Sequence, residues 1–538
     1  MTIVGAITLS RSSSTATAIT FCKVMFSFVF LTQNRVVMPF LTRQSYSRLY
    51  SFSLRSNNLG ASRILFQTAI SSDDLVTSNN DKEEAAARVK IPKKFVPFPF
   101  QYHEELTLRV DSLTNLGIGI CRTPSDFAPV PNWVVMTPNV IPGELVRVRI
   151  FRNHKTYSDA DLLEVSEPSP DRINTPRCPL STVCGGCQYQ HMTLSSQREW
   201  KREQVSELLT RIGGFAPPRR LPRVNPTVGT DRAFHYRSKI TPHYDAPRDR
   251  PSIGPIGFKE KRTRRLVDVP YCPIATEGLN AKLAEVREDV ARQVREGTIR
   301  RPKKGATLLL REANEGVVTD HNTYVTADVG GLTFRFLAGN FFQNNPHVLP
   351  IMVEHVVRAA RGGDGEGGGA TSTMTHLIDC YCGSGLFGIS CAARFEKVVG
   401  IEVNERAVEE ASANAALNGI TNCEFVAASA EAIFRNDVVN LFPRSRTAVV
   451  IDPPRKGCSE EFLEQLCEYG PERVVYMSCD PATQARDAKV LAEKGGYSIG
   501  SVQPFDLFPQ TRHIECLIVF DRCEEEESGG HTAESDEQ

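Results

Sequence analysis

Short apolar runs alternate with helical patterns from residue 376 to residue 520, and this alternation limits the fold more than any other feature. The runs are strand-like and lie at 376–380, 397–401, 423–427, 448–451, 473–477 and 516–520. Helical patterns, such as the one at 407–418, lie between some of them. Strands alternating with helices predict a doubly wound α/β sheet. Ligands bind such sheets at the carboxyl ends of the strands, so the residues that follow the runs are the candidate site residues.

A glycine turn follows the first strand, in Ile378-Asp-Cys-Tyr-Cys-Gly-Ser-Gly385. Glycine lets the backbone approach a ligand closely, and the next strand ends at Glu402, whose carboxylate can accept hydrogen bonds from both ribose hydroxyls. With Gly388, the turn also fits the G-x-G-x-x-G pattern of dinucleotide-binding enzymes. The motifs further along the chain do not fit a hydride-transferring enzyme, so the turn predicts a nucleoside ligand and no more.

The third strand is followed by Asp452-Pro-Pro-Arg-Lys-Gly457. Two prolines after an aspartate make a rigid, extended turn. Enzymes that methylate exocyclic base amines commonly have an aromatic residue where this chain has Arg455. The turn therefore argues against amine methylation.

Two residues suit addition to a pyrimidine ring. Cys479 lies just past the fourth strand, and Asp480-Pro481 begins a turn into a helix whose dipole would stabilise a thiolate. A buried cysteine that only packs is the alternative. Glu515 precedes the last strand and should lie at the same cleft. A thiolate that adds to a ring carbon and a carboxylate that removes a proton form the required pair.

Four further cysteines have the spacing of a ligand set. Cys178, Cys184 and Cys187 follow a C-x5-C-x2-C pattern. The fourth, Cys272, occurs in the segment Pro270-Tyr-Cys-Pro273. Four thiolates can hold zinc or an iron–sulfur cluster, and unligated thiols are a third possibility. The spacing alone favours zinc.

The residues before the α/β pattern predict two other units. Residues 99–167 contain short strand-like runs and the turn sequence Asn139-Val-Ile-Pro-Gly143, which together suggest a small barrel. A middle region at 168–339 contains the cysteines and the stretch 198–265, which has 17 basic and seven acidic residues. Cations attract phosphate and aromatic rings stack on bases, so this stretch suggests RNA binding, with a solvated basic surface as an equally weighted alternative.

The two ends of the chain differ in composition from the rest. Residues 1–72 have no Asp or Glu but seven Lys or Arg, which predicts a transit peptide for a mitochondrion or plastid. If the extension has no targeting role, the protein is expected to be cytoplasmic or nuclear. Residues 73–98 are predicted to be a linker and residues 523–538 an acidic tail. No run of 18 apolar residues occurs, so we expect no membrane association.

Five segments together resemble the family of S-adenosylmethionine (SAM)-dependent RNA (uracil-5-)-methyltransferases that carry an N-terminal TRAM domain. They occur in family order: Phe341-Phe-Gln-Asn-Asn345, Asp379-Cys-Tyr-Cys-Gly-Ser-Gly385, Asp452-Pro-Pro-Arg-Lys-Gly457, Ser478-Cys-Asp-Pro-Ala-Thr483 and Phe508-Pro-Gln-Thr-Arg-His-Ile-Glu515. The resemblance implies a Rossmann-like class I methyltransferase domain at 340–522. It also implies that the barrel is a TRAM, OB-like domain that binds RNA.

The resemblance also assigns residues. It implies that Gln343, Tyr381, Glu402 and Asp452 contact SAM, that Cys479 is the nucleophile and that Glu515 is the base. Two positions depart from the family pattern. Leu386 stands where relatives often have Asn, and Asp480 stands where they usually have Asn, which would place a negative charge beside the thiolate.

The cysteine spacing resembles a subset of the family that binds a [4Fe–4S] cluster, and this reverses the preference for zinc. That subset belongs more to the branch that modifies ribosomal RNA, although the family methylates both rRNA and tRNA. We therefore expect a monomeric enzyme that methylates C5 of a uridine in structured RNA through a covalent Cys479–C6 adduct. The alternatives are an RNA cytosine-5 methyltransferase and a catalytically silent RNA-binding protein.

Overall fold

The computed structural model describes residues 91–523, apart from 218–219, 246–252, 300–305, 363–373, 436–438 and 440. The predicted transit peptide, residues 73–90 of the predicted linker and all of the predicted acidic tail except Cys523 lie outside the described residues, and so these three assignments stay predictions. Within the described ranges, no helix is long and apolar enough to span a membrane.

The predicted small barrel is confirmed. Five strands close into a barrel in the order β1-β2-β3-β5-β4. Alternation of side chains builds it, because on β4 the residues Val146, Val148 and Ile150 are buried inside while Arg147 between them lies outside. Arg147 pairs there with carboxylates of neighbouring strands. The strands are β1 (Glu105–Leu113), β2 (Ile118–Arg122), β3 (Val134–Pro138), β4 (Leu145–Asn153) and β5 (Tyr157–Glu167).

The middle region consists of two long helices and small sheets. The helix α2 begins after the side-chain cap of Thr276 and is ended by Gly297, whose φ is 72°. The elements are α1 (Leu194–Arg211), β6 (Lys239–Ile240), β7 (His243–Tyr244), β8 (Ile256–Lys259), β9 (Leu266–Asp268), α2 (Glu277–Glu296), β10 (Ala306–Thr307), β11 (Leu310–Ala313), β12 (Gly316–Val318), β13 (Tyr324–Val329) and β14 (Leu332–Leu337).

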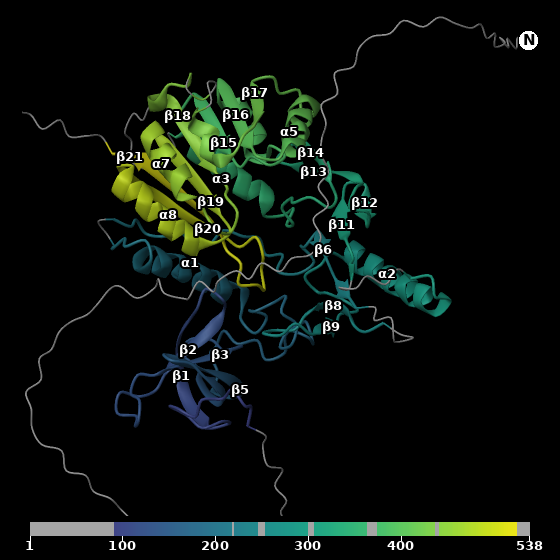
Figure 1. The fold of residues 1–538 in the computed structure, drawn as a ribbon, viewed down its shortest axis with the longest axis vertical. Coiled ribbons are helices and arrows are strands. Elements are labelled where there is room, and N and C mark those ends of the chain that lie inside the picture. Colours follow the sequence, from purple (N-terminus) through teal and green to yellow (C-terminus); the bar gives the residue numbers. More distant parts are fainter. Residues whose placement is uncertain are drawn as a thin grey trace, which may run out of the picture. The chain divides into compact units, whose positions relative to one another are not determined.

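The predicted α/β sheet has seven strands in the order β17-β16-β15-β18-β19-β21-β20 (Figure 1). β21 runs antiparallel to both of its neighbours, and the other paired strands run parallel. The strands are β15 (His376–Cys380), β16 (Lys397–Glu402), β17 (Cys423–Ala427), β18 (Thr447–Ile451), β19 (Arg473–Ser478), β20 (Tyr497–Phe505) and β21 (Glu515–Arg522). Sequence analysis missed β20, whose sequence YSIGSVQPF mixes polar residues, Gly and Pro with its apolar ones.

Helices cover both faces of this sheet (Figure 1). Ile378 of β15 packs in a core cluster with residues of α1, α7 and α8, whereas its neighbour Leu377 packs with residues of α3 and α4 on the other face. α1 therefore covers this sheet although it precedes the sheet by more than a hundred residues. The helices are α3 (Leu349–Arg361), α4 (Leu386–Cys391), α5 (Glu405–Leu417), α7 (Glu460–Tyr469) and α8 (Pro481–Lys494); short 3-10 turns are η1 (Ala392–Arg394), η2 (Ala430–Arg435) and η3 (Arg444–Arg446).

Candidate functional site

Three of the predicted SAM-contacting residues lie side by side at the carboxyl edge of the sheet. β15 is paired in register with β16 and with β18, so that the ends of these three strands are level. Glu402 is the last residue of β16, Tyr381 follows β15, and Asp452 follows β18. The strand order reverses between β15 and β18, and the crevice at such a reversal is where α/β sheets bind ligands.

The glycine turn after β15 is shaped to border a ligand. Gly383 and Gly385 have φ values of 54° and 89°, a region that only glycine adopts readily. A Cβ atom added to Gly383 would meet no atom within 4 Å, so the turn faces open space. The backbone amide of Gly383 donates to Glu402 Oε2 over 3.3 Å, and that of Asn404 donates to Oε1 over 2.9 Å. These two bonds hold the Glu402 carboxylate beside the turn.

Asp379 provides a further sign that a polar ligand completes this site. Its side chain is fully buried, and its Oδ2 accepts a 2.7 Å hydrogen bond from the Gly388 amide. Its Oδ1 is buried and has no hydrogen-bond partner among the described residues. Burial raises the pKa of Asp379 to about 7, and it also raises the pKa of Asp452 to about 7. A hydrogen-bond donor of a bound ligand would give the unpaired Oδ1 of Asp379 a partner and so remove the cost of burying it unpaired.

Tyr381 borders this crevice, whereas Gln343 lies in a segment outside the sheet. Tyr381 has a φ of 63°, and its ring packs 5.4 Å from that of Phe462 between centroids. Gln343 is buried in the segment between β14 and α3. Two residues further on, the amide nitrogen of the Asn345 side chain donates to the carbonyl of Leu507 over 2.9 Å. The segment that contains Gln343 is therefore attached to the segment that precedes Glu515.

The structure places Cys479 directly after β19 and Glu515 at the start of the adjacent strand β21. β19 and β21 are antiparallel, and Ser478 is level with Cys516. The paired residues end there, and Cys479 and Glu515 are the next residues of the two chain segments. Cys479 is partly exposed and Glu515 is 4% exposed. A thiol accessible to substrate and a buried carboxyl group therefore lie at the same edge of the sheet as the crevice.

The charges around this pair disfavour a permanent thiolate. Burial raises the pKa of Cys479 to about 11, and the nearby carboxylates of Glu515 and Asp452 add to the shift. Burial, followed by the charge of Asp452, raises the pKa of Glu515 to about 8. Arg455 opposes both shifts by its charge, and its side chain also hydrogen-bonds the Cys479 thiol. Arg455 is thus the cation that favours the thiolate.

Sequence analysis missed this position of Arg455. The residue was used only to argue against amine methylation, because an aromatic residue is usual at that place. Its position in the turn Asp452-Pro-Pro-Arg455 was the available signal, since that turn follows a strand of the same sheet. A hydrogen bond from Thr483 Oγ1 to the Arg455 carbonyl, 3.2 Å long, anchors the turn to α8.

Asp480 has a structural role that explains its carboxylate. Its Oδ1 accepts hydrogen bonds from the amides of Ala482, at 3.1 Å, and Thr483, at 3.4 Å, and so caps the first turn of α8. The negative charge that the sequence places beside the thiolate is therefore directed to the helix N-terminus. Asp and Asn are equally good at this position.

We expect Asp480→Asn to change the free energy of unfolding by less than about 0.5 kcal/mol, because both side chains cap a helix. Asp480→Ala should lower it by about 1 kcal/mol, because two amides of α8 lose their acceptor. Chemical denaturation of the three proteins measures both changes. An alanine variant as stable as the parent would show that the cap contributes nothing.

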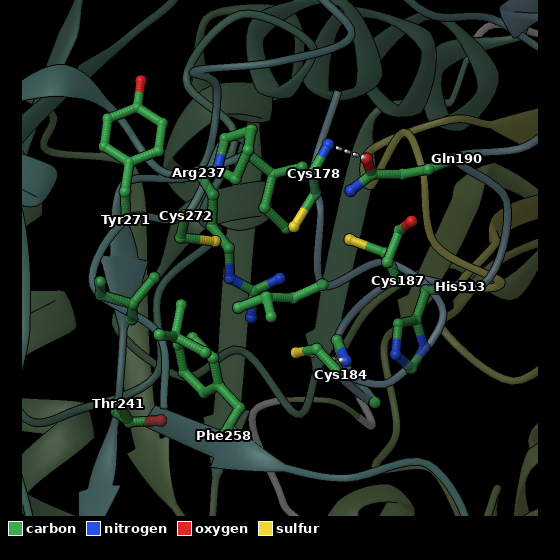
Figure 2. Close-up of a pocket in the computed structure, with 18 residues that line it drawn as sticks. Cys178, Cys184, Cys187, Gln190, Arg237, Thr241, Phe258, Tyr271, Cys272 and His513 are labelled. Atoms are coloured by element: carbon green, nitrogen blue, oxygen red, sulfur yellow. Dashed lines mark hydrogen bonds between the residues drawn. The ribbon is translucent and has the colours of Figure 1, made fainter. Parts of the chain in front are cut away.

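The four cysteines with ligand-like spacing line one cavity of about 240 Å³ (Figure 2). Cys178, Cys184 and Cys187 come from the segment between β5 and α1, and Cys272 comes from the segment between β9 and α2. Figure 2 shows His513 beside Cys184 and Cys187. The structure thus brings together four residues that lie up to 94 positions apart (272 minus 178).

Backbone contacts hold this cavity in shape. The Gln190 side chain accepts a 3.0 Å hydrogen bond from the Cys178 amide, and the Asn280 side chain of α2 accepts one of 2.8 Å from the Cys272 amide. Among the described residues, no three or more His, Cys, Asp or Glu side chains are arranged to hold a metal ion. The four cysteines are among the residues that line the cavity.

The chain is similar to known RNA methyltransferases. A family model described as tRNA (uracil-5-)-methyltransferase matches residues 306–523. A tRNA (uracil(54)-C(5))-methyltransferase of Schizosaccharomyces pombe is 38% identical over 432 residues, which are 78% of this chain and 79% of the relative. The enzyme of the same description from Saccharomyces cerevisiae is 31% identical and covers 87% of this chain and 79% of the relative.

A solved structure has the same fold. The Pyrococcus abyssi tRNA (uracil-54, C5)-methyltransferase, in complex with S-adenosyl-L-homocysteine, aligns with a TM-score of 0.56 and 23% sequence identity. The alignment covers 77% of this chain and all of that chain. It supports a class I methyltransferase sheet.

Proposed function

Because the chain belongs to the tRNA (uracil-5-)-methyltransferase family, and so transfers a methyl group from SAM to C5 of a uridine in RNA, we propose that its substrate is tRNA. The names of the two yeast relatives support uridine 54 as the target. The cysteine spacing had pointed to the rRNA-modifying branch instead. The single observation that supports the mechanism proposed below is the placement of Cys479 and Glu515 at the same end of two adjacent strands.

The crevice at the carboxyl edge is proposed to bind SAM. Glu402, held by two backbone amides, would accept hydrogen bonds from the ribose, and the unpartnered Oδ1 of Asp379 would accept one from a donor of the ligand. Tyr381, Asp452 and Gln343 complete the proposed set. When bound, SAM supplies a methyl group that is electrophilic because it is attached to a positively charged sulfonium.

Cys479 is proposed to activate the uracil ring. C5 of uracil is a poor nucleophile, so the thiolate first forms a bond to C6, and the electrons of the C5=C6 double bond move into an enolate. C5 can then take the methyl group. The target base must leave its stack to reach the thiol. Arg455, which hydrogen-bonds the thiol, would stabilise the attacking thiolate.

Glu515 is proposed to complete the reaction. Its carboxylate removes the proton from C5, the electrons of that C–H bond restore the C5=C6 double bond, and the C6–S bond breaks with its electrons returning to sulfur. Because Glu515 and Cys479 lie at the same end of two adjacent strands, the carboxylate would be within reach of a ring bound to the thiol. General bases of this kind contribute about 10²–10⁴-fold in rate.

The test of substrate and chemistry is methyl transfer from labelled SAM to transcribed tRNA, to the same tRNA with cytidine at position 54, and to rRNA fragments. We expect 5-methyluridine in the first RNA alone. A product in rRNA alone would overturn the proposed substrate, and 5-methylcytidine would indicate a cytosine-5 methyltransferase. SAM binding without any product would favour a silent RNA-binding protein.

A [4Fe–4S] cluster is the proposed occupant of the cysteine cavity. The donor set of four thiols, Cys178, Cys184, Cys187 and Cys272, fits a cluster, and so does their placement around a cavity of about 240 Å³. Zinc is the alternative, but a single ion needs four sulfurs that converge on one point. The cluster would tie the segment before α1 to the start of α2.

We expect protein purified without oxygen to be brown and to contain iron and acid-labile sulfide in equal amounts. Cys187→Ser and Cys272→Ser should lose most of the iron, because each removes a thiolate ligand. Cys523→Ser, which changes an exposed cysteine, is the matched control and should retain it. Protein that contains stoichiometric zinc and no iron would contradict the proposed cluster and favour a zinc site.

A further inference from the structure

The loop that leads to Glu515 is held by residues outside the methyltransferase sheet. This Glu515 loop comprises residues 506–514, between β20 and β21. We infer that α1 positions the catalytic carboxylate, with Gln197 and Lys201 holding the Glu515 loop in the form that places Glu515 at the same edge of the sheet as Cys479. The inference rests on the function proposed above, because it assigns these two residues to the step that Glu515 performs.

Lys201 anchors the start of the loop. Its Nζ lies 2.6 Å from Asp506 Oδ1, and both side chains are completely buried. The same Nζ donates a 3.2 Å hydrogen bond to the carbonyl of Phe508. On the other carboxylate oxygen of Asp506, Arg198 Nε lies at 3.5 Å. A buried ion pair adds little stability compared with apolar packing, whereas it does specify one geometry for the loop.

Gln197 anchors the middle of the loop. Its Nε2 donates to Gln510 Oε1 over 3.1 Å, and its Oε1 accepts from the Gln510 backbone amide over 2.8 Å. Gln510 has a φ of 70°, which is unfavourable for a residue other than glycine. Surrounding contacts must therefore hold it there. The hydroxyl of Tyr236 adds a 2.8 Å hydrogen bond to the carbonyl of Pro509.

The segment that carries the cysteines supports the same loop. The backbone amides of Gln188 and Tyr189 both donate to the Gln510 carbonyl over 3.0 Å. The Gln188 side chain accepts a 3.1 Å hydrogen bond from the Arg512 amide. Gln188 directly follows Cys187 in the chain. The loop is thus bound by α1 and by the residues just before it, and Glu515 follows three residues after Arg512.

Cys479 is held differently. It lies between β19 and the N-terminus of α8, which is capped by Asp480. Loosening the Glu515 loop should therefore leave thiolate addition and methyl transfer in place. It should slow the last step, in which Glu515 takes the C5 proton, the C5=C6 bond forms again and the C6–S bond breaks. Misplacing a catalytic group by about 1 Å can lower a rate by about 10²-fold.

The experiment compares Gln197→Ala with Lys201→Met and with the control Glu199→Ala, which changes an exposed residue of α1. Each full-length protein is mixed with tRNA and methyl-labelled SAM. Released product and the labelled RNA that stays attached to protein on a denaturing gel are both measured. We expect Gln197→Ala and Lys201→Met to lower turnover at least about tenfold and to increase the attached methylated RNA. KM for SAM should change less than turnover does.

If the amounts of released product and of protein-attached RNA both fall, the inference is overturned. A purely structural role of α1 would lower both amounts. Gln197→Ala removes no charge, so it decides the outcome if Lys201→Met does not fold. Adding Gln510→Ala to Gln197→Ala should reduce turnover little further, since the two side chains act through one contact. If Glu515→Gln also shows no attached RNA, the proposed mechanism itself is wrong, and not only the role of α1.

Discussion

Cys479→Ala is expected to lower turnover by about 10⁴-fold or more, because without a thiolate at C6 the uracil C5 has no route to a nucleophilic form. The variant should still bind SAM. The residues proposed to contact SAM lie on β15, β16 and β18 or between β14 and α3, whereas Cys479 follows β19. Turnover with labelled SAM and calorimetric titration with S-adenosyl-L-homocysteine measure the two properties separately.

A matched cysteine variant separates loss of chemistry from loss of structure. Cys523→Ala changes an exposed cysteine at the end of the described chain and should keep full activity. Cys479→Ala should also form no RNA adduct that survives denaturation. Turnover of Cys479→Ala at the parent rate would show that this thiol is not the nucleophile, and a different residue would then have to activate the ring.

Glu515→Gln is expected to lower turnover by about 10²–10⁴-fold while methylated RNA accumulates on the protein. Glutamine keeps the size of the side chain but cannot take the C5 proton, so the reaction stops after methyl transfer. A denaturing gel with labelled SAM measures the trapped complex. The matched control is Glu493→Gln, an exposed residue of α8, which should release product at the parent rate. Release of product by Glu515→Gln at that rate would contradict the assignment.

The pH dependence of the last step follows from the raised pKa of Glu515, about 8. A base acts only when deprotonated, so the rate of product release should rise with pH up to about pH 8 and level off above it. Adduct formation should keep rising beyond that point, because the pKa of Cys479 is about 11. In Glu515→Gln, the rate of product release should no longer rise with pH up to about pH 8. Single-turnover rates at a series of pH values distinguish the two groups.

The edge of the sheet was predictable because its residues are marked by local pattern. Each apolar run ended at the strand end that the structure shows to within a few residues, and Glu402, Asp452 and Cys479 each stand at such an end. Parallel neighbours bring their carboxyl ends together wherever they lie in the order of strands. Glu515 reaches the same edge for the opposite reason, since it begins an antiparallel strand.

Several parts of the site depend on contacts that no local pattern marks. Arg455 faces the thiol only because the turn after β18 packs against α8. Asp480 looked like a charge beside the nucleophile, yet its carboxylate caps a helix. β20 was missed because polar residues interrupt its apolar pattern, and one of them, Gln503, is buried where its side chain hydrogen-bonds the Pro226 carbonyl. In each case the function of the side chain depends on which other residues it contacts in the folded protein.

The sequence by itself determined six of the seven strands of the sheet and the family, and it predicted the reactive pair, because periodicity and short motifs are properties of neighbouring residues. Only the tertiary structure decided what holds that pair in place. Gln197 and Gln510 are separated by 313 positions, and Lys201 and Asp506 by 305. A glutamine or lysine on a helix is usually a solvated side chain. These become buried anchors only because α1 packs against the sheet that carries Glu515.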